Sequence, residues 1–265
     1  MYNIGFLGSG KMAAALVTSI IKSGLSGPDE VICYDVSEEA LQRITEELHV
    51  QITTDAPEVM SRSDIIFLAF KPQNFPDAVT DLTSHVRDDH LIVSILAGVR
   101  LSQLRQHLPG QIVRVMPNTC CLIGEMAAGF APADNVIPAN LNIVKSILNS
   151  AGLAIQVDEN QLDAVTGLSG SGPAFVAYLI QRFIAGGVEA GLPYEGAKAL
   201  ALKTFSGTAN LLQQWQMPPE ELIDMVSSPN GTTVAGRKIL ENSDVASVLS
   251  DTVLRAAERS RELGL

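Results

Sequence analysis

Short apolar runs alternate with stretches of helical hydrophobic periodicity along the first part of the chain. Several of the runs are continuously apolar, as strands are when both faces of a parallel sheet are buried. Strands that alternate with helices predict βαβ units and a mostly parallel sheet. The pattern predicts strands at residues 3–7, 31–34, 65–70, 91–96, 112–115 and 126–130, and helices at residues 11–24, 37–48, 73–86 and 100–108.

The pattern changes near residue 155. Residues 153–157 form one last candidate strand, and the chain beyond Asp158 carries helical patterns only. Asp163 is a candidate helix cap. The segment that begins at Pro173 is too apolar for a solvent-facing helix, so it forms either a central core helix or part of a subunit interface. Helices are predicted here at residues 173–187, 195–214, 218–226, 233–241 and 244–262.

The chain is therefore expected to contain two domains of different class. An α/β domain of the nucleotide-binding type covers residues 1–157, and an all-helical C-terminal domain covers residues 158–265. A length of 265 residues fits this division, and 46% hydrophobic against 18% charged residues allows a substantial core. The net charge of −11 argues against a nucleic-acid or anionic-membrane partner, because both require a basic face.

The cysteines indicate a reducing compartment. Cys33, Cys120 and Cys121 are an odd set with two adjacent members, which is no disulfide framework, and no Cys/His spacing suggests zinc or another metal site. The first residues lack the basic start of a signal peptide, and the longest apolar runs are too short to span a bilayer. We therefore expect a soluble, cytoplasmic protein.

The first strand is followed directly by a GxGxxA motif and a helix. Gly8 allows a tight turn, Gly10 lets the backbone approach a pyrophosphate, and the small Ala13 lets the helix pack closely on the strand. The helix N-terminus then presents free N–H groups to the phosphates. The motif is weak alone, but its strand–turn–helix context predicts a Rossmann dinucleotide site.

The second predicted strand ends at Asp35, which is 25 residues past Gly10. An acid at this place accepts hydrogen bonds from the adenosine ribose and repels a 2′-phosphate, which favours NADH. Ser37 lies in the following turn, where it can contact a 2′-phosphate instead. The alternative role for Asp35 is a helix cap, so both NADPH and NADH stay candidates.

Further candidates follow the third, fourth and fifth strands, because ligands bind at the carboxyl ends of parallel strands. Lys71 faces either the cofactor or solvent, and Pro72 keeps it out of helical geometry. Asn118 is a candidate for the nicotinamide side, whereas Arg114 fits a structural ion pair better. The candidate cofactor-binding residues are Leu7, Gly8, Ser9, Gly10, Lys11, Met12, Asp35, Ser37, Ala69, Phe70, Lys71, Pro72, Ala97, Gly98 and Asn118.

Two motifs in the helical half have no titrating side chain. GLSGSGPAF at residues 167–175 reads as a helix start, with Ser171 or Gly172 as the cap and Pro173 in the first turn. SSPNGTT at residues 227–233 also precedes a helical pattern, and it offers hydroxyls and backbone N–H groups. The helical half contains no histidine or cysteine.

With these motifs together, the chain resembles the pyrroline-5-carboxylate reductases, which complete proline synthesis. The resemblance runs the whole length of the chain. It rests on GSGKMA at 8–13, AFKPQ at 69–73, RVMPNT at 114–119, GLSGSGPAF at 167–175 and SSPNGTT at 227–233.

The resemblance implies an N-terminal Rossmann domain and a C-terminal dimerisation domain, with dimers that often assemble into decamers. It implies reduction of the cyclic imino acid 1-pyrroline-5-carboxylate to L-proline by NADPH or NADH. A protonated imine accepts hydride without a general base, so the protein has only to position the ring and hold its carboxylate. The residues carried over to substrate binding are Glu159, Ser228, Gly231, Thr232 and Thr233, with Thr233 near the ring nitrogen as the catalytic candidate.

The chain departs from the family pattern at several places. Asn230 replaces a glycine in the SPxGTT loop, and Asn tolerates left-handed backbone angles better than most residues. Cys120 stands where Pro usually follows MPNT, and Ala56 stands where NADPH-preferring members often carry a polar residue. Two alternatives stay open: a related reductase for another cyclic imine, such as a piperideine carboxylate, and a catalytically silent nucleotide-binding relative.

Overall fold

The computed structural model describes residues 2–264 and divides into two compact units. The first unit comprises the chain up to Ser171 together with the C-terminal stretch from Arg255, and the second comprises Gly172–Leu254. The domain boundary that the sequence predicts, after residue 157, lies inside the first unit and stays a prediction. Residues 158–171 belong to the first unit by their contacts.

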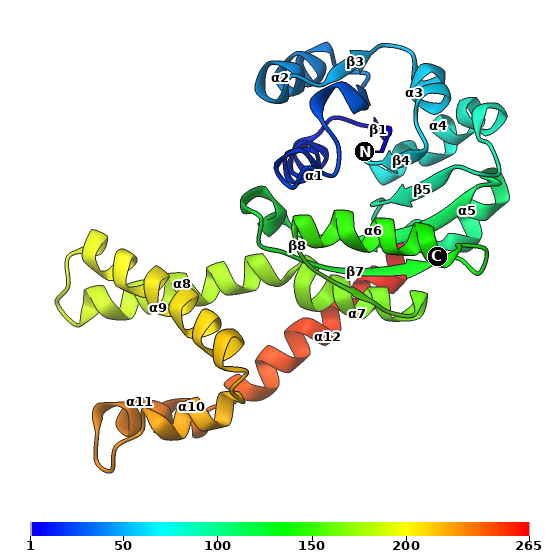
Figure 1. Ribbon diagram of the computed structural model, residues 1–265. Coiled ribbons are helices and arrows are strands. Elements are labelled where there is room, and N and C mark those ends of the chain that lie inside the picture. Colours follow the sequence, from blue (N-terminus) through cyan, green and yellow to red (C-terminus); the bar gives the residue numbers. More distant parts are fainter. Residues whose placement is uncertain (1, 265) are drawn as a thin grey trace. The chain divides into compact units, whose positions relative to one another are not determined.

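The first unit is built on one eight-stranded sheet (Figure 1). Its order is β3-β2-β1-β4-β5-β6-β7-β8, and every pair is parallel except β6–β7. The order 3-2-1-4-5 is that of a Rossmann fold, so the predicted α/β class is confirmed. The strands are β1 (Ile4–Leu7), β2 (Val31–Tyr34), β3 (Gln51–Thr53), β4 (Ile65–Leu68), β5 (Leu91–Ser94), β6 (Gln111–Met116), β7 (Met126–Pro132) and β8 (Gly152–Gln156).

Helices cover both faces of this sheet, and alternate strand residues face opposite cores. Phe6 and Phe67 point to one core, where their rings stack with centroids 4.6 Å apart, while Leu7 and Leu68 point to the other. Burial on both faces explains why these strands read as continuous apolar runs. The first core includes residues of α1 (Lys11–Lys22), α2 (Glu38–Leu48) and α6 (Pro138–Ser150); the second includes residues of α3 (Ala56–Arg62), α4 (Phe75–Leu82) and α5 (Leu101–His107).

The sequence prediction missed three elements of the first unit. β3 is a short, partly polar edge strand, so it lacks the apolar run that marked the other strands. α3 has only seven residues and carries a proline in its first turn. α6 is rich in asparagine and serine, which are poor helix formers, and these residues obscure the helical spacing of its apolar residues.

Several predicted boundaries also needed correction. The third and fourth expected strands end at Leu68 and Ser94, two residues earlier than predicted in each case, because the chain turns away from the sheet at the carboxyl ends of these strands. The helix expected at 73–86 is divided into the 3₁₀ turn Pro72–Asn74, α4 and the 3₁₀ turn Thr83–His85.

The second unit is helical throughout and has little core of its own. It holds α8 (Gly172–Glu189), α9 (Tyr194–Trp215), α10 (Pro219–Met225), α11 (Thr232–Glu241) and the part of α12 (Val245–Leu263) that precedes Arg255. α8 and α9 pack through Phe183 and Phe205, whose ring centroids are 5.0 Å apart. Ala197 and Ala201 are the buried residues of this unit. The prediction of helices without strands beyond residue 158 is confirmed for the described residues.

No helix within residues 2–264 combines the length and the apolar character needed to cross a lipid bilayer.

Candidate cofactor and substrate sites

The turn between β1 and α1 has the geometry of a phosphate-binding turn. Gly8 has a φ of 107°, and a Cβ there would lie 2.6 Å from the carbonyl carbon of Ala69, so only glycine fits. Gly10 is the N-cap of α1, and a Cβ on it would meet nothing within 4 Å. Within residues 2–264, no side chain caps the N-terminus of α1. These features fit a diphosphate that approaches the backbone at Gly10.

Asp35 fixes the position of this turn relative to the end of β2. Its Oδ2 accepts from the backbone N–H of Ser9 at 2.7 Å, and its Oδ1 accepts from that of Ser37 at 2.9 Å. The N-cap of α2 is Ser37, whose hydroxyl accepts from the N–H of Ala40 at 3.3 Å. The structure therefore gives the capping role to Ser37 rather than to Asp35.

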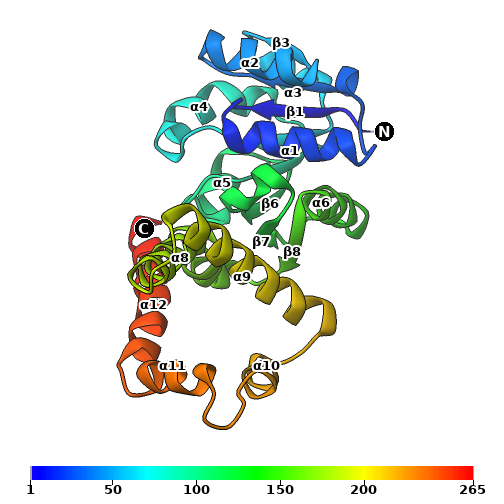
Figure 2. The same cartoon turned by 90° about the vertical axis from the view of Figure 1, so that its left-hand side faces the viewer.

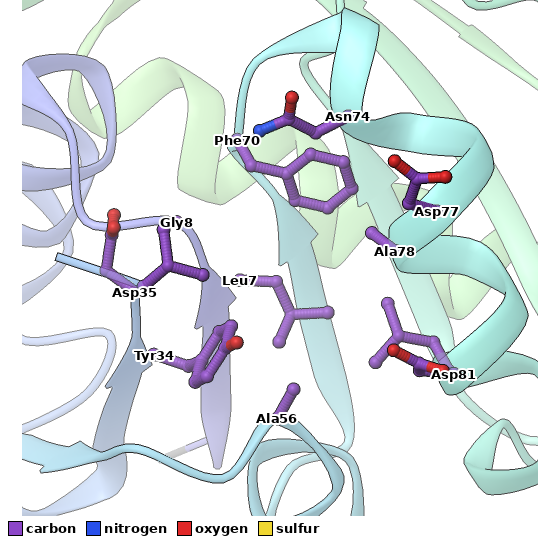
Figure 3. Close-up of a pocket in the computed structure, with 12 residues that line it drawn as sticks. Leu7, Gly8, Tyr34, Asp35, Ala56, Phe70, Asn74, Asp77, Ala78 and Asp81 are labelled. Carbon is purple, nitrogen blue, oxygen red and sulfur yellow. The ribbon is translucent and has the colours of Figure 1, made fainter.

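A cavity of about 340 Å³ opens beside Asp35, at the carboxyl ends of β1, β2 and β4 (Figure 3). The strand order reverses between β1 and β4, and such a switch point is where open α/β sheets bind ligands. The cavity is within the usual size range of ligand sites. Its apolar lining includes Leu7, Ala56, Phe70 and Ala78, and its acids are Asp35, Asp77 and Asp81.

Sequence reasoning did not find the α4 side of this cavity. Asn74, Asp77, Ala78 and Asp81 contribute to the lining but carry no known motif. Asp77 and Asp81 are four residues apart and therefore share a helix face. The spacing predicts two acids on one helix face, but only the structure shows that this face of α4 lies beside the strand ends.

The segments after β4 and β5 lie at the same edge of the sheet. Lys71 is exposed and has the extended angles φ −70° and ψ 134°, as expected before Pro72. Gly98 has a φ of 79°, and a Cβ on it would lie 3.4 Å from the carbonyl oxygen of Leu263. Arg100 Nε donates to the carbonyl oxygen of Gly264 at 3.1 Å. The last residues of the described chain thus hold the segment after β5.

The side chain of Asn118 is buried and forms hydrogen bonds within the first unit. Its Nδ2 donates to the carbonyl oxygen of Ser169 at 3.1 Å, and its Oδ1 accepts from the N–H of Ala127 at 3.1 Å. These bonds tie the end of β6 to β7 and to the GLSGSGPAF segment. A nicotinamide contact by Asn118 stays a prediction.

Arg114 and Glu159 form a part-buried ion pair, with Nη1 and Oε1 3.1 Å apart. The expectation of a structural ion pair for Arg114 is therefore confirmed. The same Oε1 accepts from the N–H of Leu101 at 2.6 Å, at the start of α5. The other oxygen, Oε2, accepts no hydrogen bond from the described residues, and substrate contact by Glu159 stays a prediction.

A helix begins in the GLSGSGPAF segment as the sequence predicts, because α8 starts at Gly172 with Pro173 in its first turn. Residues Thr166–Gly170 form a π-helical turn, and the N–H of Ser171 donates to the carbonyl oxygen of Thr166 at 2.8 Å. Ser171 has right-handed helical angles, φ −85° and ψ −22°, rather than the extended backbone typical of an N-cap, so the Ser171 cap that the sequence suggested is wrong. Asp163 is not a helix cap either, because it lies inside α7 (Leu162–Val165), whose N-cap is Gln161. Its Oδ1 accepts from the Ser260 hydroxyl at 2.6 Å.

The SSPNGTT loop connects α10 to α11 in the second unit (Figure 2). The N–H of Gly231 donates to the carbonyl oxygen of Ser228 at 2.9 Å, which closes a turn over Pro229 and Asn230. Asn230 has a φ of 60°, the left-handed angle that a type II turn requires after proline. Asn230 therefore keeps a turn in the place of the usual glycine.

The N-terminus of α11 offers unpaired donors. Gly231 is its N-cap, and no side chain of the described residues caps it. Thr232 and Thr233 in the first turn are exposed. Arg237, one turn further, has its Nη1 3.4 Å from the Ser227 hydroxyl and its Nε 2.8 Å from Glu241 Oε1. Backbone N–H groups at a helix start, together with two hydroxyls, suit a carboxylate.

Two of the three cysteines, Cys33 and Cys121, are buried. Burial raises the pKa of the Cys33 thiol to about 12 and that of the Cys121 thiol to about 11. Both thiols therefore stay protonated at neutral pH, and a thiol has little nucleophilic power. Among the described residues, no group of three or more His, Cys, Asp or Glu is placed to hold a metal ion. The helix starts at α1 and at α11 each suit an anionic ligand.

The turn at Gly8 and the cavity at the switch point define a Rossmann-type dinucleotide-dependent protein. Residues 3–98 match the family described as NADP oxidoreductase, coenzyme F420-dependent, and residues 159–263 match pyrroline-5-carboxylate reductase dimerisation. The chain is 40% identical over 263 residues to the pyrroline-5-carboxylate reductase of Methanosarcina acetivorans, covering 98% of this chain and 97% of the relative. The chain belongs to the pyrroline-5-carboxylate reductase family.

Other relatives and solved structures agree. The pyrroline-5-carboxylate reductase of Arabidopsis thaliana is 38% identical, over 99% of this chain and 95% of the relative. The structure of the Coxiella burnetii pyrroline-5-carboxylate reductase matches with a TM-score of 0.95 and 28% identity, over 100% of this chain and 99% of that one. The Plasmodium falciparum enzyme, solved with NADP bound, matches with a TM-score of 0.88 and 28% identity, over 100% and 98%.

Proposed function

We propose that this protein reduces 1-pyrroline-5-carboxylate to L-proline with NADPH or NADH, as the last step of proline biosynthesis. The observation that carries the proposal is the match over nearly the whole chain to reductases of that name. The geometry supports it, because both the phosphate-binding turn and the uncapped helix start suit the two anionic ligands that this reaction needs.

In this proposal the first unit binds the dinucleotide. The start of α1 receives the diphosphate at Gly10, and Asp35 lies at the edge of the cavity that takes the adenosine. The remaining cofactor contacts come from the segments after β4 and β5 and from Asn118. When bound, the nicotinamide supplies the hydride. The contacts on the protein side are those of Leu7, Gly8, Ser9, Gly10, Lys11, Met12, Asp35, Ser37, Ala69, Phe70, Lys71, Pro72, Ala97, Gly98 and Asn118.

The start of α11 binds the substrate carboxylate. The backbone N–H groups that follow Gly231 and the hydroxyls of Ser228 and Thr232 supply the donors. The Thr233 hydroxyl accepts a hydrogen bond from the protonated imine nitrogen and keeps the C=N bond oriented. Hydride adds to the imine carbon, the C=N electron pair moves to nitrogen, and the product leaves as an amine, so no general base is required. Glu159 is proposed as a further substrate contact.

We propose a homodimer that forms through the C-terminal helices and assembles further into a decamer. The support is the dimerisation match over residues 159–263 and the scarcity of buried residues in the second unit. The start of that match agrees with a domain boundary after residue 157. The free cysteines Cys33, Cys120 and Cys121 support a cytoplasmic location. Light scattering on the purified protein tests the assembly.

The activity is tested by following oxidation of the cofactor by absorbance in the presence of 1-pyrroline-5-carboxylate, once with NADH and once with NADPH. We expect oxidation that depends on the imine and that proline inhibits. A six-membered piperideine carboxylate is the comparison substrate, and a faster rate on it would reassign the substrate. No oxidation of either cofactor with the five-membered imine would contradict the proposal.

A further inference from the structure

The C-terminal end of α12 packs against the turn that follows β5. Arg100 Nε donates to the carbonyl oxygen of Gly264 at 3.1 Å, although the two residues are 164 positions apart in the chain. A Cβ on Gly264 would lie 3.0 Å from the carbonyl oxygen of Gly98, and a Cβ on Gly98 would lie 3.4 Å from that of Leu263. The two backbones are therefore in close contact, and a side chain at either glycine would press on the other segment.

A second contact anchors this end of α12 within the first unit. Ala257 and Ser260 are buried, and their spacing of three places them on one face of the helix. The Ser260 hydroxyl donates to Asp163 Oδ1 at 2.6 Å, and both residues are buried. A hydrogen bond to a carboxylate is stronger than one between neutral groups, so this bond fixes the place where the helix ends.

The segment that carries Asp163 also holds the far end of the turn after β5. Glu159, four residues before Asp163, accepts from the backbone N–H of Leu101 at 2.6 Å. The turn is thus held at one end by Glu159 and, through α12, at the other end by Asp163. Arg100 lies between these two supports, and its cation is at the C-terminal end of a helix, where the helix dipole favours a positive charge.

This turn lies on the nicotinamide side of the proposed cofactor site. A dinucleotide crosses the switch point of the sheet with its diphosphate at the start of α1. With the adenosine half toward Asp35 at the end of β2, the nicotinamide half extends toward β4 and β5. Ala97 and Gly98 follow β5 at its carboxyl end, and Ala97 is exposed.

We propose that the end of α12, residues 255–264, is a positioning element for the nicotinamide half of the cofactor, with Arg100 and Ser260 as its positioning residues. The inference rests on the proposed cofactor site and deepens it. Both residues act through the turn rather than by touching the cofactor. They keep the left-handed backbone of Gly98, with its φ of 79°, ordered before the cofactor arrives, so binding does not have to order the turn.

The experiment measures binding of NAD⁺ and of ADP to the full-length protein by calorimetry, with no imine present. ADP contains the adenosine and the diphosphate but lacks the nicotinamide half, so it reports on the rest of the cofactor site. Arg100→Ala removes the donor to Gly264, and Arg100→Lys keeps a cation there. The matched control is Arg105→Ala, because this second arginine of α5 pairs with Asp134 Oδ2 at 3.7 Å instead.

Gly264→Ala tests the same contact from the α12 side. The new Cβ would lie 3.0 Å from the carbonyl oxygen of Gly98, so the turn has to move by a few tenths of an ångström. This substitution leaves Arg100 unchanged and adds no group at the cofactor edge of the sheet. Thermal melting shows that each variant folds.

We expect Arg100→Ala and Gly264→Ala to bind NAD⁺ roughly 3- to 10-fold more weakly than the natural chain, the range that loss of one hydrogen bond produces. ADP affinity should change less than about twofold, and Arg100→Lys should recover most of the NAD⁺ affinity. Arg105→Ala should bind both ligands as the natural chain does. Natural NAD⁺ affinity in Arg100→Ala or in Gly264→Ala would overturn the proposal, and so would an equal loss for NAD⁺ and ADP or an equal response of Arg105→Ala.

Because no imine is present, this result is separate from the proposed reaction. A protein that shows the selective loss of NAD⁺ affinity but oxidises no cofactor with 1-pyrroline-5-carboxylate would keep the inference and lose the proposed substrate. A protein that reduces the imine, and whose Arg100→Ala variant binds NAD⁺ with natural affinity, would keep the function and lose the inference.

Discussion

The two compact units differ in how far each completes its own core. In the first unit, helices bury both faces of the sheet, and side chains such as Phe6, Phe67 and Phe130 are fully enclosed. In the second unit, Ala197 and Ala201 are the buried residues, while Phe183, Leu200 and Trp215 are more than half exposed. Large apolar surface of this extent marks an association surface. The first unit is thus completed by its own chain, and the second requires another copy.

The candidate sites follow the same division. The cofactor site is held by hydrogen bonds between segments far apart in sequence, such as those of Asp35 with Ser9 and Asn118 with Ser169. The SSPNGTT loop, where we propose substrate binding, relies on one local turn, from Ser228 to Gly231, and on exposed donors. Changes in the first unit should therefore alter stability and binding together, whereas changes in the second should alter association or turnover with little effect on the first.

The largest expected effect is that of Gly8→Ala. The new Cβ would lie 2.6 Å from the backbone of Ala69, at a φ of 107°. Backbone strain of about 1–2 kcal/mol adds to overpacking of about 1–3 kcal/mol, so melting should occur at a clearly lower temperature and NAD⁺ binding should be lost. Gly10→Ala is the control, because its Cβ enters open space; it should weaken binding and leave melting unchanged. Full stability of Gly8→Ala would show that the turn is less constrained than the geometry indicates.

Thr233→Ala should lower kcat roughly 10- to 100-fold, because a hydrogen bond to a charged group contributes about 1.5–3 kcal/mol. Binding of NAD⁺ to the first unit should not change. Steady-state kinetics with 1-pyrroline-5-carboxylate and calorimetry with NAD⁺ separate the two quantities. Thr233→Ser keeps a hydroxyl and should retain most activity. If Thr233→Ala turns over at the natural rate, that hydroxyl has no role in catalysis.

Leu200→Glu should weaken association, since this leucine of α9 is 59% exposed in a single chain. A buried charge at an apolar interface is unfavourable by several kcal/mol, so light scattering at micromolar concentration should show a smaller mass. Leu200→Met keeps the apolar contact and should leave the mass unchanged. NAD⁺ binding should persist in both variants. An unchanged mass for Leu200→Glu would place the association surface elsewhere.

The smallest expected effect concerns His90, at the amino end of β5. Burial, and next the neighbouring Arg87, lower the pKa of His90 from its ordinary value of 6.5. Between that ordinary value and the lowered one, the unfolded chain takes up a proton that the folded chain does not. The free energy of unfolding therefore falls as the pH drops from 7 to 5.

His90→Gln should flatten this dependence, with a change in melting temperature of less than about 4 °C at pH 5 relative to pH 7. The exposed His85 provides the control variant, His85→Gln, which should retain the natural pH dependence. Identical pH profiles for His90→Gln and the natural chain would assign the acid sensitivity to other groups.

Much of the fold and part of each site could be predicted from local sequence. The strand–turn–helix at Gly8, the acid at the end of β2 and the helix at Thr232 were all placed correctly, because each depends on neighbouring residues. The edge strand β3 and the helices α3 and α6 were missed, because their local patterns are weak. The partner of Asn118 was also beyond prediction, since it lies 51 residues away along the chain.

The sequence by itself determined the alternation of strands and helices, the phosphate-binding turn and the turn at Asn230, because these follow from the steric limits of glycine, proline and asparagine. The tertiary structure alone decided that Asp77 and Asp81 face Asp35, that Glu159 pairs with Arg114, and that Asp163 accepts from Ser260 rather than capping a helix. Contacts of this kind depend on how packed elements bring side chains together that are far apart in the sequence. Local sequence patterns do not specify that packing.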